Sequence, residues 1–340
     1  MSVRSQDRRR VQAGAGRIAV LGAGAIGGYV AAALARGGAD VHVIARGENL
    51  ASIQRQGIRV RSPRGDFDAH PPATDDPSKV GPVDFVFLGL KANCYATAGP
   101  LLEPLLHDDT AVIAAQNGIP WWYFHGLDGP FAARRIHAVD PDGAVSDVIP
   151  PRRAIGCVVY AGTELEAPGV IRHMEGTRFT IGEPDGTQSE RCGRFSEAMI
   201  AGGLKCPVET TELRNQLWIK LMGNVALNPV SALTRATIAG MCRHAPTRQL
   251  IAAMMHEALD VAHAVGASPE VSVQQRMAGA EKVGEHRTST LQDLLAGKRL
   301  ERGPIIDAVI ELADLTGVEV PSLRAVGACC GLLADSLGLA

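Results

Sequence analysis

The sequence lacks the features with which proteins usually bind nucleic acids. Aromatic residues make up only 4% of the 340 residues, so few rings are available for bases to stack on. Lys and Arg number 34 and Asp and Glu 36, which gives a formal net charge of -2. A chain without a positive field attracts neither a nucleic acid nor an anionic membrane surface. We therefore expect no nucleic-acid partner and no membrane partner.

The seven cysteines have a spacing that matches no motif. Their number is odd, no pair has C-x-x-C spacing, and no Cys/His cluster has the spacing of zinc ligands. We interpret them as thiols of a reducing, cytoplasmic compartment, and we expect no metal. No apolar run is long enough to cross a bilayer.

The first sixteen residues form a polar segment with four arginines and no apolar core, unlike a secretory signal. We expect residues 1–16 to be a disordered extension. The whole chain has an ordinary globular composition, with 46% hydrophobic and 21% charged residues. Its length suggests two domains, since a domain usually has about 100–200 residues. We place the first at residues 17–208 and the second, all-helical one at residues 209–340.

A dinucleotide-binding motif opens the first domain. Residues 18–21 predict a buried strand, residues 29–36 a helix and residues 41–44 a second strand. Between the first strand and the helix lies Gly22-Ala23-Gly24-Ala25-Ile26-Gly27, which fits G-x-G-x-x-G in its informative context. Its first glycine permits a tight turn, the second lets the backbone approach a pyrophosphate, and the third lets the helix pack on the strand. The alternative is a glycine-rich turn of a doubly wound sheet that binds no nucleotide.

Three polar residues follow predicted strands of this domain. Arg46 stands where NAD-binding proteins usually carry an acidic residue for the ribose hydroxyl. A guanidinium suits the 2′-phosphate instead, so we predict NADP(H) as the cofactor. Lys91 and Asn117 follow the strands predicted at residues 85–90 and 111–114, and ligands of open α/β sheets bind beyond the carboxyl ends of strands. Each of the three could instead be an ordinary surface or turn residue.

The remainder of the first domain has a strand-like pattern. Short runs at residues 154–160, 170–173 and 179–182 predict an antiparallel extension of the sheet. A helix at residues 188–202 and a short strand near Val208 complete the domain. The predicted fold class is therefore α/β, a Rossmann-like NADP-binding domain followed by an all-α domain.

The second domain begins with a helix that Thr210 or Thr211 caps and that continues to Pro229. Three polar residues share one face of this otherwise apolar helix, at i, i+4 and i+8: Lys220, Asn224 and Asn228. A lysine partly removed from water can donate a proton to a developing alkoxide, and two amides can hold its target. The alternative is a polar network between helices, or a lysine that extends to solvent.

Taken in order, these motifs resemble the ketopantoate reductase (2-dehydropantoate 2-reductase) family over residues 17–325. The resemblance rests on the glycine motif, Lys91, Gln116-Asn117-Gly118, the helix from Trp218-Ile219-Lys220-Leu221 to Asn228-Pro229, and Ser289-Thr290-Leu291-Gln292-Asp293 with Glu301 twelve residues after Ser289.

The resemblance implies a role for each matching residue. Lys220 matches the family's catalytic lysine, which donates a proton to the carbonyl oxygen. The residues that match substrate contacts are Asn117, Lys220, Asn224, Asn228 and Ser289. Those that match cofactor contacts are Gly22, Ala23, Gly24, Ala25, Ile26, Gly27, Arg46, Lys91, Asn117 and Glu301. From its chemistry alone, Ser289 could cap a helix and Glu301 could be a solvated charge.

The sequence departs from the family pattern on the substrate side. Thr290 stands where the family usually has Met, and Leu300 where Thr is common. Ile238 replaces a further asparagine of some members, and Arg302-Gly303-Pro304 replaces an apolar and acidic continuation. These departures bear on which 2-oxo acid is used more than on the transfer of a hydride.

The resemblance implies an NADP-dependent oxidoreductase that reduces 2-dehydropantoate to (R)-pantoate, a step of pantothenate biosynthesis. Two alternatives stay open: reduction of another branched 2-oxo acid, and a non-catalytic NADP-binding sensor or scaffold. A homodimer is compatible with the apolar helical half.

Overall fold

The computed structural model describes residue 14 and residues 16–339. The extension expected at residues 1–16 therefore lies outside the described residues, apart from Gly14 and Gly16. The described residues cluster into two compact units. The first unit contains residues up to 116, 124–128 and 144–213, and the second contains 117–123, 129–143 and the chain from 214 onward. The division predicted at residue 209 places residues 117–123 and 129–143 in the first domain, whereas the structure groups these two short segments with the second unit.

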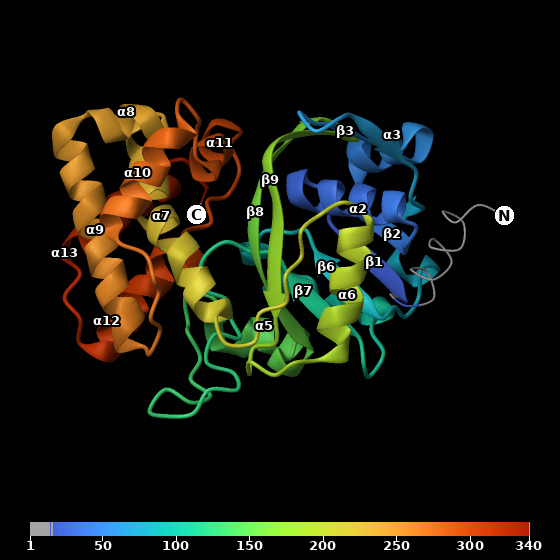
Figure 1. Ribbon diagram of the computed structural model, residues 1–340, viewed down its shortest axis with the longest axis horizontal. Coiled ribbons are helices and arrows are strands. Elements are labelled where there is room, and N and C mark those ends of the chain that lie inside the picture. Colours follow the sequence, from blue (N-terminus) through green and yellow to red (C-terminus); the bar gives the residue numbers. More distant parts are fainter. Residues whose placement is uncertain (1–13, 15, 340) are drawn as a thin grey trace. The chain divides into compact units, whose positions relative to one another are not determined.

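The first unit is built on one sheet, in which nine strands are described (Figure 1). Their order is β4-β3-β9-β8-β7-β6-β1-β2-β5. The central strands β2, β1, β6 and β7 are parallel, as short apolar runs buried on both faces predict. β8 and β9 form an antiparallel hairpin beside β7. The strands are β1 (Arg17–Leu21), β2 (Asp40–Ile44), β3 (Ile58–Arg61), β4 (Phe67–Ala69), β5 (Ala73–Thr74), β6 (Phe85–Leu88), β7 (Ala111–Ala114), β8 (Ala154–Ala167) and β9 (Val170–Gly182).

The predicted α/β fold is confirmed, with differences at individual strands. The antiparallel extension consists of two strands of 14 and 13 residues rather than of short runs. The sequence pattern did not predict β3 and β4, because each offers only three or four residues and β3 alternates buried with charged positions. Near Val208 the chain forms a single bridge with Ile181 rather than a strand.

Two helices, α2 and α6, pack on the sheet and on each other in the main core of the first unit (Figure 1). Their ends approach closely because both carry glycine: a Cβ on Gly37 would lie 2.6 Å from the backbone nitrogen of Gly202. The helices of this unit are α2 (Ala25–Gly37), α3 (Gly47–Gln56), α4 (Gly99–Leu102), α5 (Ala144–Val148) and α6 (Glu190–Ala201). Its short 3-10 helices are η1 (Pro77–Lys79), η2 (Ala92–Thr97), η3 (Glu103–Leu105) and η5 (Pro151–Arg153), whereas η4 (Pro141–Gly143) belongs to the second unit.

The second unit is helical where it has regular structure. Its elements are α7 (Leu213–Thr234), α8 (Ile238–Arg243), α9 (Ala245–Ala264), α10 (Val273–Val283), α11 (Ser289–Leu295), the π-helical η6 (Gly303–Asp307), α12 (Ala308–Thr316) and α13 (Pro321–Ser336). Two predictions about α7 were wrong. It starts at Leu213 rather than after a cap at Thr210 or Thr211, and it runs through Pro229 to Thr234. Proline removes one backbone hydrogen bond, and burial of the surrounding turns keeps the helix continuous here.

Membrane spans and metal clusters are both absent from the part of the chain that the structure describes. No helix of that part combines the length and the apolar character that a membrane span requires. Within the same residues, no group of three or more His, Cys, Asp or Glu side chains is arranged to hold a metal ion.

Candidate functional site

The glycine motif forms a tightly packed turn between β1 and α2. Gly22 has φ +94°, a conformation that side chains rarely adopt, and its N–H donates to the carbonyl oxygen of Ile44 at 2.9 Å. A Cβ on Gly27 would overlap the carbonyl oxygen of Gly22, and a Cβ on Gly89 would overlap the same atom. Three glycines therefore interlock, and the turn has room for no side chain at any of them.

The N-terminus of α2 is open to an anion. Gly24 is the N-cap and carries no side chain, and no acidic residue stands in the first turn of this fully described helix. A Cβ on Gly24 would meet nothing nearer than the carbonyl oxygen of Gly89 at 3.9 Å, so another molecule can approach the backbone here. Unsatisfied N–H groups at a helix N-terminus favour a phosphate. The turn therefore fits the pyrophosphate of a dinucleotide.

Arg46 and Lys91 lie at the same edge of the sheet as this turn. β1 stands between β6 and β2, and the three are parallel, so their carboxyl ends meet at one edge. Arg46 is exposed and precedes α3, and Lys91 is half-buried and precedes η2. Two cations and a helix N-terminus at one edge form a favourable site for the phosphates of a cofactor.

The polar stripe predicted on the helix of the second unit lies on α7. Lys220 and Asn224 are half-buried, and Asn228 is only 5% exposed. Partial exclusion of water strengthens the interaction of an ammonium group with a developing negative charge. The stripe can therefore orient a polar ligand and protonate it.

A small pocket brings the far end of this stripe together with later parts of the chain. It joins Asn228 of α7 to Glu301 and to Thr290, the position at which the family usually has Met. The residues that line it are Asn228, Pro229, Thr290, Glu301, Arg302, Ile305, Ile306 and Cys330. Two of the predicted site residues, far apart in sequence, thus share one pocket of the second unit.

Asn117 belongs to the second unit, and its loop is attached there at two places. Gly118 has φ +82° and packs so closely that a Cβ would overlap the carbonyl oxygen of Pro304. The N–H of Ile119 donates to that same oxygen at 2.8 Å. At the other end of the loop, the carbonyl oxygen of Tyr123 accepts a 2.9 Å hydrogen bond from Nε of Arg214 on α7. The loop that carries Asn117 is therefore fixed both to α7 and to the segment after Glu301.

Ser289 does not cap a helix, which was one interpretation of its sequence position. The cap of α11 is Thr288, whose hydroxyl accepts a 3.2 Å hydrogen bond from the N–H of Leu291. Ser289 is the first residue of α11 and is exposed. Its hydroxyl is therefore not engaged in capping this helix.

Sequence reasoning missed two residues next to the predicted site. Asn49 of α3 donates to the carbonyl oxygen of Ala23 inside the glycine motif. Arg276 of α10 lies against Gly223 of α7: a Cβ on Gly223 would be 2.8 Å from its Nε. Gly223 lies between Lys220 and Asn224 on the helix, so this guanidinium adds a cation beside the stripe. No local pattern marks either residue, because both reach the site through tertiary contacts.

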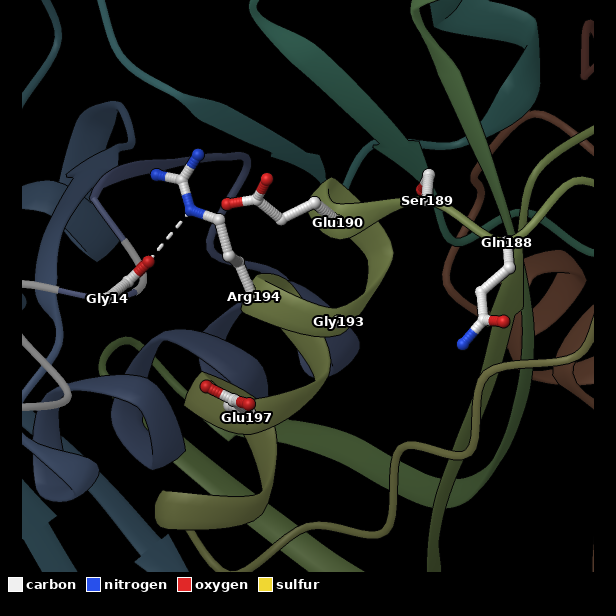
Figure 2. Close-up of a pocket in the computed structure, with 7 residues that line it drawn as sticks. All are labelled: Gly14, Gln188, Ser189, Glu190, Gly193, Arg194 and Glu197. Carbon is white, nitrogen blue, oxygen red and sulfur yellow. Dashed lines mark hydrogen bonds between the residues drawn. The ribbon is translucent and has the colours of Figure 1, made fainter.

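A second hollow lies on the first unit, at the first turns of α6. Figure 2 shows Arg194 extending from α6 toward Gly14, to whose carbonyl oxygen its Nε donates at 2.8 Å. The lining residues are Gly14, Gln188, Ser189, Glu190, Gly193, Arg194 and Glu197. Two carboxylates in this set disfavour a phosphate, and none of the predicted site residues is among them. The glycine turn is therefore the better cofactor site.

Comparison with known proteins agrees with the motifs. The family model described as "Ketopantoate reductase PanE/ApbA" matches residues 18–186, and "Ketopantoate reductase PanE/ApbA C terminal" matches residues 212–333. A 2-dehydropantoate 2-reductase of Mesorhizobium japonicum is 43% identical over 323 residues, which cover 95% of this chain and 99% of the relative.

Solved structures of similar proteins have the same fold as this chain. A structure from Ralstonia solanacearum MolK2 has a TM-score of 0.88 at 34% identity and covers 96% of this chain and 99% of its own. A 2-dehydropantoate 2-reductase from Geobacter metallireducens has a TM-score of 0.81 at 25% identity, with coverages of 93% and 99%. The predicted family is thereby confirmed: the chain belongs to the ketopantoate reductase family, PanE/ApbA.

Proposed function

We propose that this protein reduces the ketone of 2-dehydropantoate to (R)-pantoate with NADPH, and that Lys220 is the proton donor. The observation that carries the proposal is the half-buried Lys220 in line with Asn224 and Asn228 on α7. It occurs in a chain that is 43% identical, over 95% of its length, to a 2-dehydropantoate 2-reductase.

The choice of NADPH over NADH rests on Arg46. This exposed guanidinium follows β2, at the edge of the sheet where the glycine turn offers its helix N-terminus. It would hold the 2′-phosphate, and the first turn of α2 would hold the pyrophosphate. Lys91 at the end of β6 adds a second positive charge to the same edge. When bound, NADPH supplies the hydride.

The residues of the second unit would act on the substrate. Lys220 donates a proton to the ketone oxygen as negative charge develops there. Asn224 and Asn228 hold the polar groups of the substrate, which keeps the ketone oxygen within reach of the ammonium group. We assign Asn117 and Ser289 to the substrate as well, and Glu301 to the junction of substrate and cofactor. The pocket shared by Asn228 and Glu301 supports the last assignment.

One observation favours a second candidate, a different branched 2-oxo acid. Thr290 lines the pocket next to Asn228, where the family usually has the larger Met. A smaller side chain leaves space for a larger substrate substituent, because buried volume controls which apolar groups fit. The pocket thus bears on the size of the substrate and leaves the reaction type unchanged.

A panel of substrates tests the proposal. The purified protein is mixed with NADPH and either 2-dehydropantoate or 2-oxo acids with smaller and larger branches, and the loss of NADPH absorbance is followed. We expect the highest kcat/KM with 2-dehydropantoate. A higher value with a bulkier acid would support the second candidate, and NADPH binding without turnover of any acid would support a sensor. The homodimer stays a prediction, which sedimentation velocity would test.

A further inference from the structure

Asn49 connects the glycine turn to a distant part of the first unit. Its Nδ2 donates to the carbonyl oxygen of Ala23 at 2.7 Å, and its Oδ1 accepts from the N–H of Gly169 at 2.8 Å. Gly169 lies in the turn between β8 and β9, so one half-buried amide bridges two backbone segments and uses both of its ends.

The bond to Ala23 fixes the orientation of one peptide unit. The peptide between Ala23 and Gly24 is planar and trans, so its carbonyl oxygen and its N–H point in opposite directions. With the oxygen of Ala23 held toward Asn49, the N–H of Gly24 must point away from Asn49. A flip of this peptide would exchange the two groups.

Such a flip would cost little without Asn49. It changes ψ of the first residue and φ of the second, and Gly24 has no Cβ to oppose a new φ. The flipped peptide would present a carbonyl oxygen where an anion needs a donor. We propose that Asn49 is a positioning residue that keeps the N–H of Gly24 directed at the cofactor's pyrophosphate, an inference that rests on the proposed use of a nicotinamide dinucleotide.

Ser52 provides a matched control on the same helix. Its hydroxyl donates to the carbonyl oxygen of Pro168 at 2.7 Å, and the side chain is buried. Ser52→Ala therefore removes a bond from α3 to the same β8–β9 turn but leaves the bond to Ala23 in place. A loss caused only by loosening this turn would appear in both variants.

The experiment measures NADPH binding to the wild type, Asn49→Ala and Ser52→Ala by titration calorimetry, together with KM and kcat. We expect Asn49→Ala to raise the Kd and the KM for NADPH about tenfold with kcat unchanged, as the loss of one hydrogen bond at a charged ligand predicts. Ser52→Ala should change neither the Kd nor the KM for NADPH by more than about twofold. Adenosine 2′-monophosphate, which lacks the pyrophosphate, should bind all three proteins equally.

A second variant guards against misfolding. Asn49→Asp keeps an acceptor for the N–H of Gly169 but loses the donor to Ala23, so it should weaken NADPH binding at least as much as Asn49→Ala. The change that Asn49→Asp causes in the Kd of adenosine 2′-monophosphate measures the effect of the added negative charge. Equal losses for NADPH and the monophosphate, or a Kd within twofold of wild type in both Asn49 variants, would overturn the proposal. Because binding is measured directly, the outcome does not depend on which 2-oxo acid is reduced.

Discussion

The indole N–H of Trp218 donates a hydrogen bond to the hydroxyl oxygen of Tyr123 across 2.7 Å, and both side chains are almost fully buried. Trp218 precedes Lys220 by two residues on α7, and Tyr123 ends the short segment of the second unit that begins at Asn117. The rings meet edge to face, 88° apart. The helix that carries the proposed proton donor therefore also anchors the loop that carries a proposed substrate contact.

Tyr123 should make stability depend on alkaline pH. Burial raises the pKa of Tyr123 to about 12 from an ordinary value of 10.0. Between these values the unfolded chain loses a proton that the folded protein keeps, so the free energy of unfolding falls as the pH rises, by up to about 2–3 kcal/mol. Tyr123→Phe should be less stable at neutral pH, because the N–H of Trp218 loses its acceptor, and should show a shallower alkaline decline.

Urea unfolding of both proteins at several pH values from 8 upward measures this difference. Buried thiols, including Cys192 with its pKa raised to about 12 by burial, contribute equally to the two curves. Parallel curves for wild type and Tyr123→Phe would show that Tyr123 does not titrate in this range.

Two glycine substitutions should have opposite effects on stability. Gly27→Ala places a Cβ on the carbonyl oxygen of Gly22, so we expect a loss of about 1–3 kcal/mol and much weaker NADPH binding. Gly193 lies inside α6, where an added Cβ would meet nothing within 4 Å, so Gly193→Ala should be neutral or stabilising by up to about 1 kcal/mol. Thermal unfolding with and without NADPH checks both. An unaffected Gly27→Ala protein would refute the tight packing of the turn.

Arg46→Ala should change the choice of cofactor. The guanidinium would pair with the 2′-phosphate, so its loss should lower kcat/KM for NADPH about tenfold or more and leave the value for NADH nearly unchanged. The ratio of the two values, measured with one 2-oxo acid, gives the result. An equal loss of kcat/KM with both cofactors would show that Arg46 does not recognise the 2′-phosphate.

Arg276→Ala should weaken the binding of an anionic substrate. Its guanidinium lies against Gly223, between Lys220 and Asn224 along α7, and a 2-oxo acid carries a carboxylate. We expect KM for the acid to rise about tenfold and KM for NADPH to stay the same, because a charge-assisted hydrogen bond contributes about 1.5–3 kcal/mol. Arg248→Ala, on the neighbouring helix α9, is the control for a lost surface cation. An unchanged KM for the acid would show that Arg276 does not bind the substrate.

Local sequence patterns predicted those parts of the candidate site whose residues lie close together in the chain. The glycine motif follows from a strand, a turn and a helix within thirty residues, and the α7 stripe from spacing along one helix. Ser289 shows the limit of such reasoning, since its chemistry allows it to cap a helix and only the backbone geometry identifies Thr288 as the cap of α11.

The remaining parts depend on contacts between distant residues. Asn49 meets Gly169, 120 positions later, and no pattern around either residue indicates the other. The segment from Asn117 joins the second unit because its glycine packs on Pro304, although it directly follows a strand of the first. Such partners are set by packing, which single-sequence periodicity does not encode.

Replacement of Lys220 by alanine is the most direct test of the proposed proton transfer. NADPH oxidation and pantoate formation are measured with 2-dehydropantoate for the wild type and for Lys220→Ala, and NADPH binding is measured for both. We expect kcat to fall about a hundredfold or more, as for loss of a positioned general acid, while NADPH binds with unchanged Kd. Near-normal turnover by Lys220→Ala would contradict the assignment of Lys220 as the proton donor.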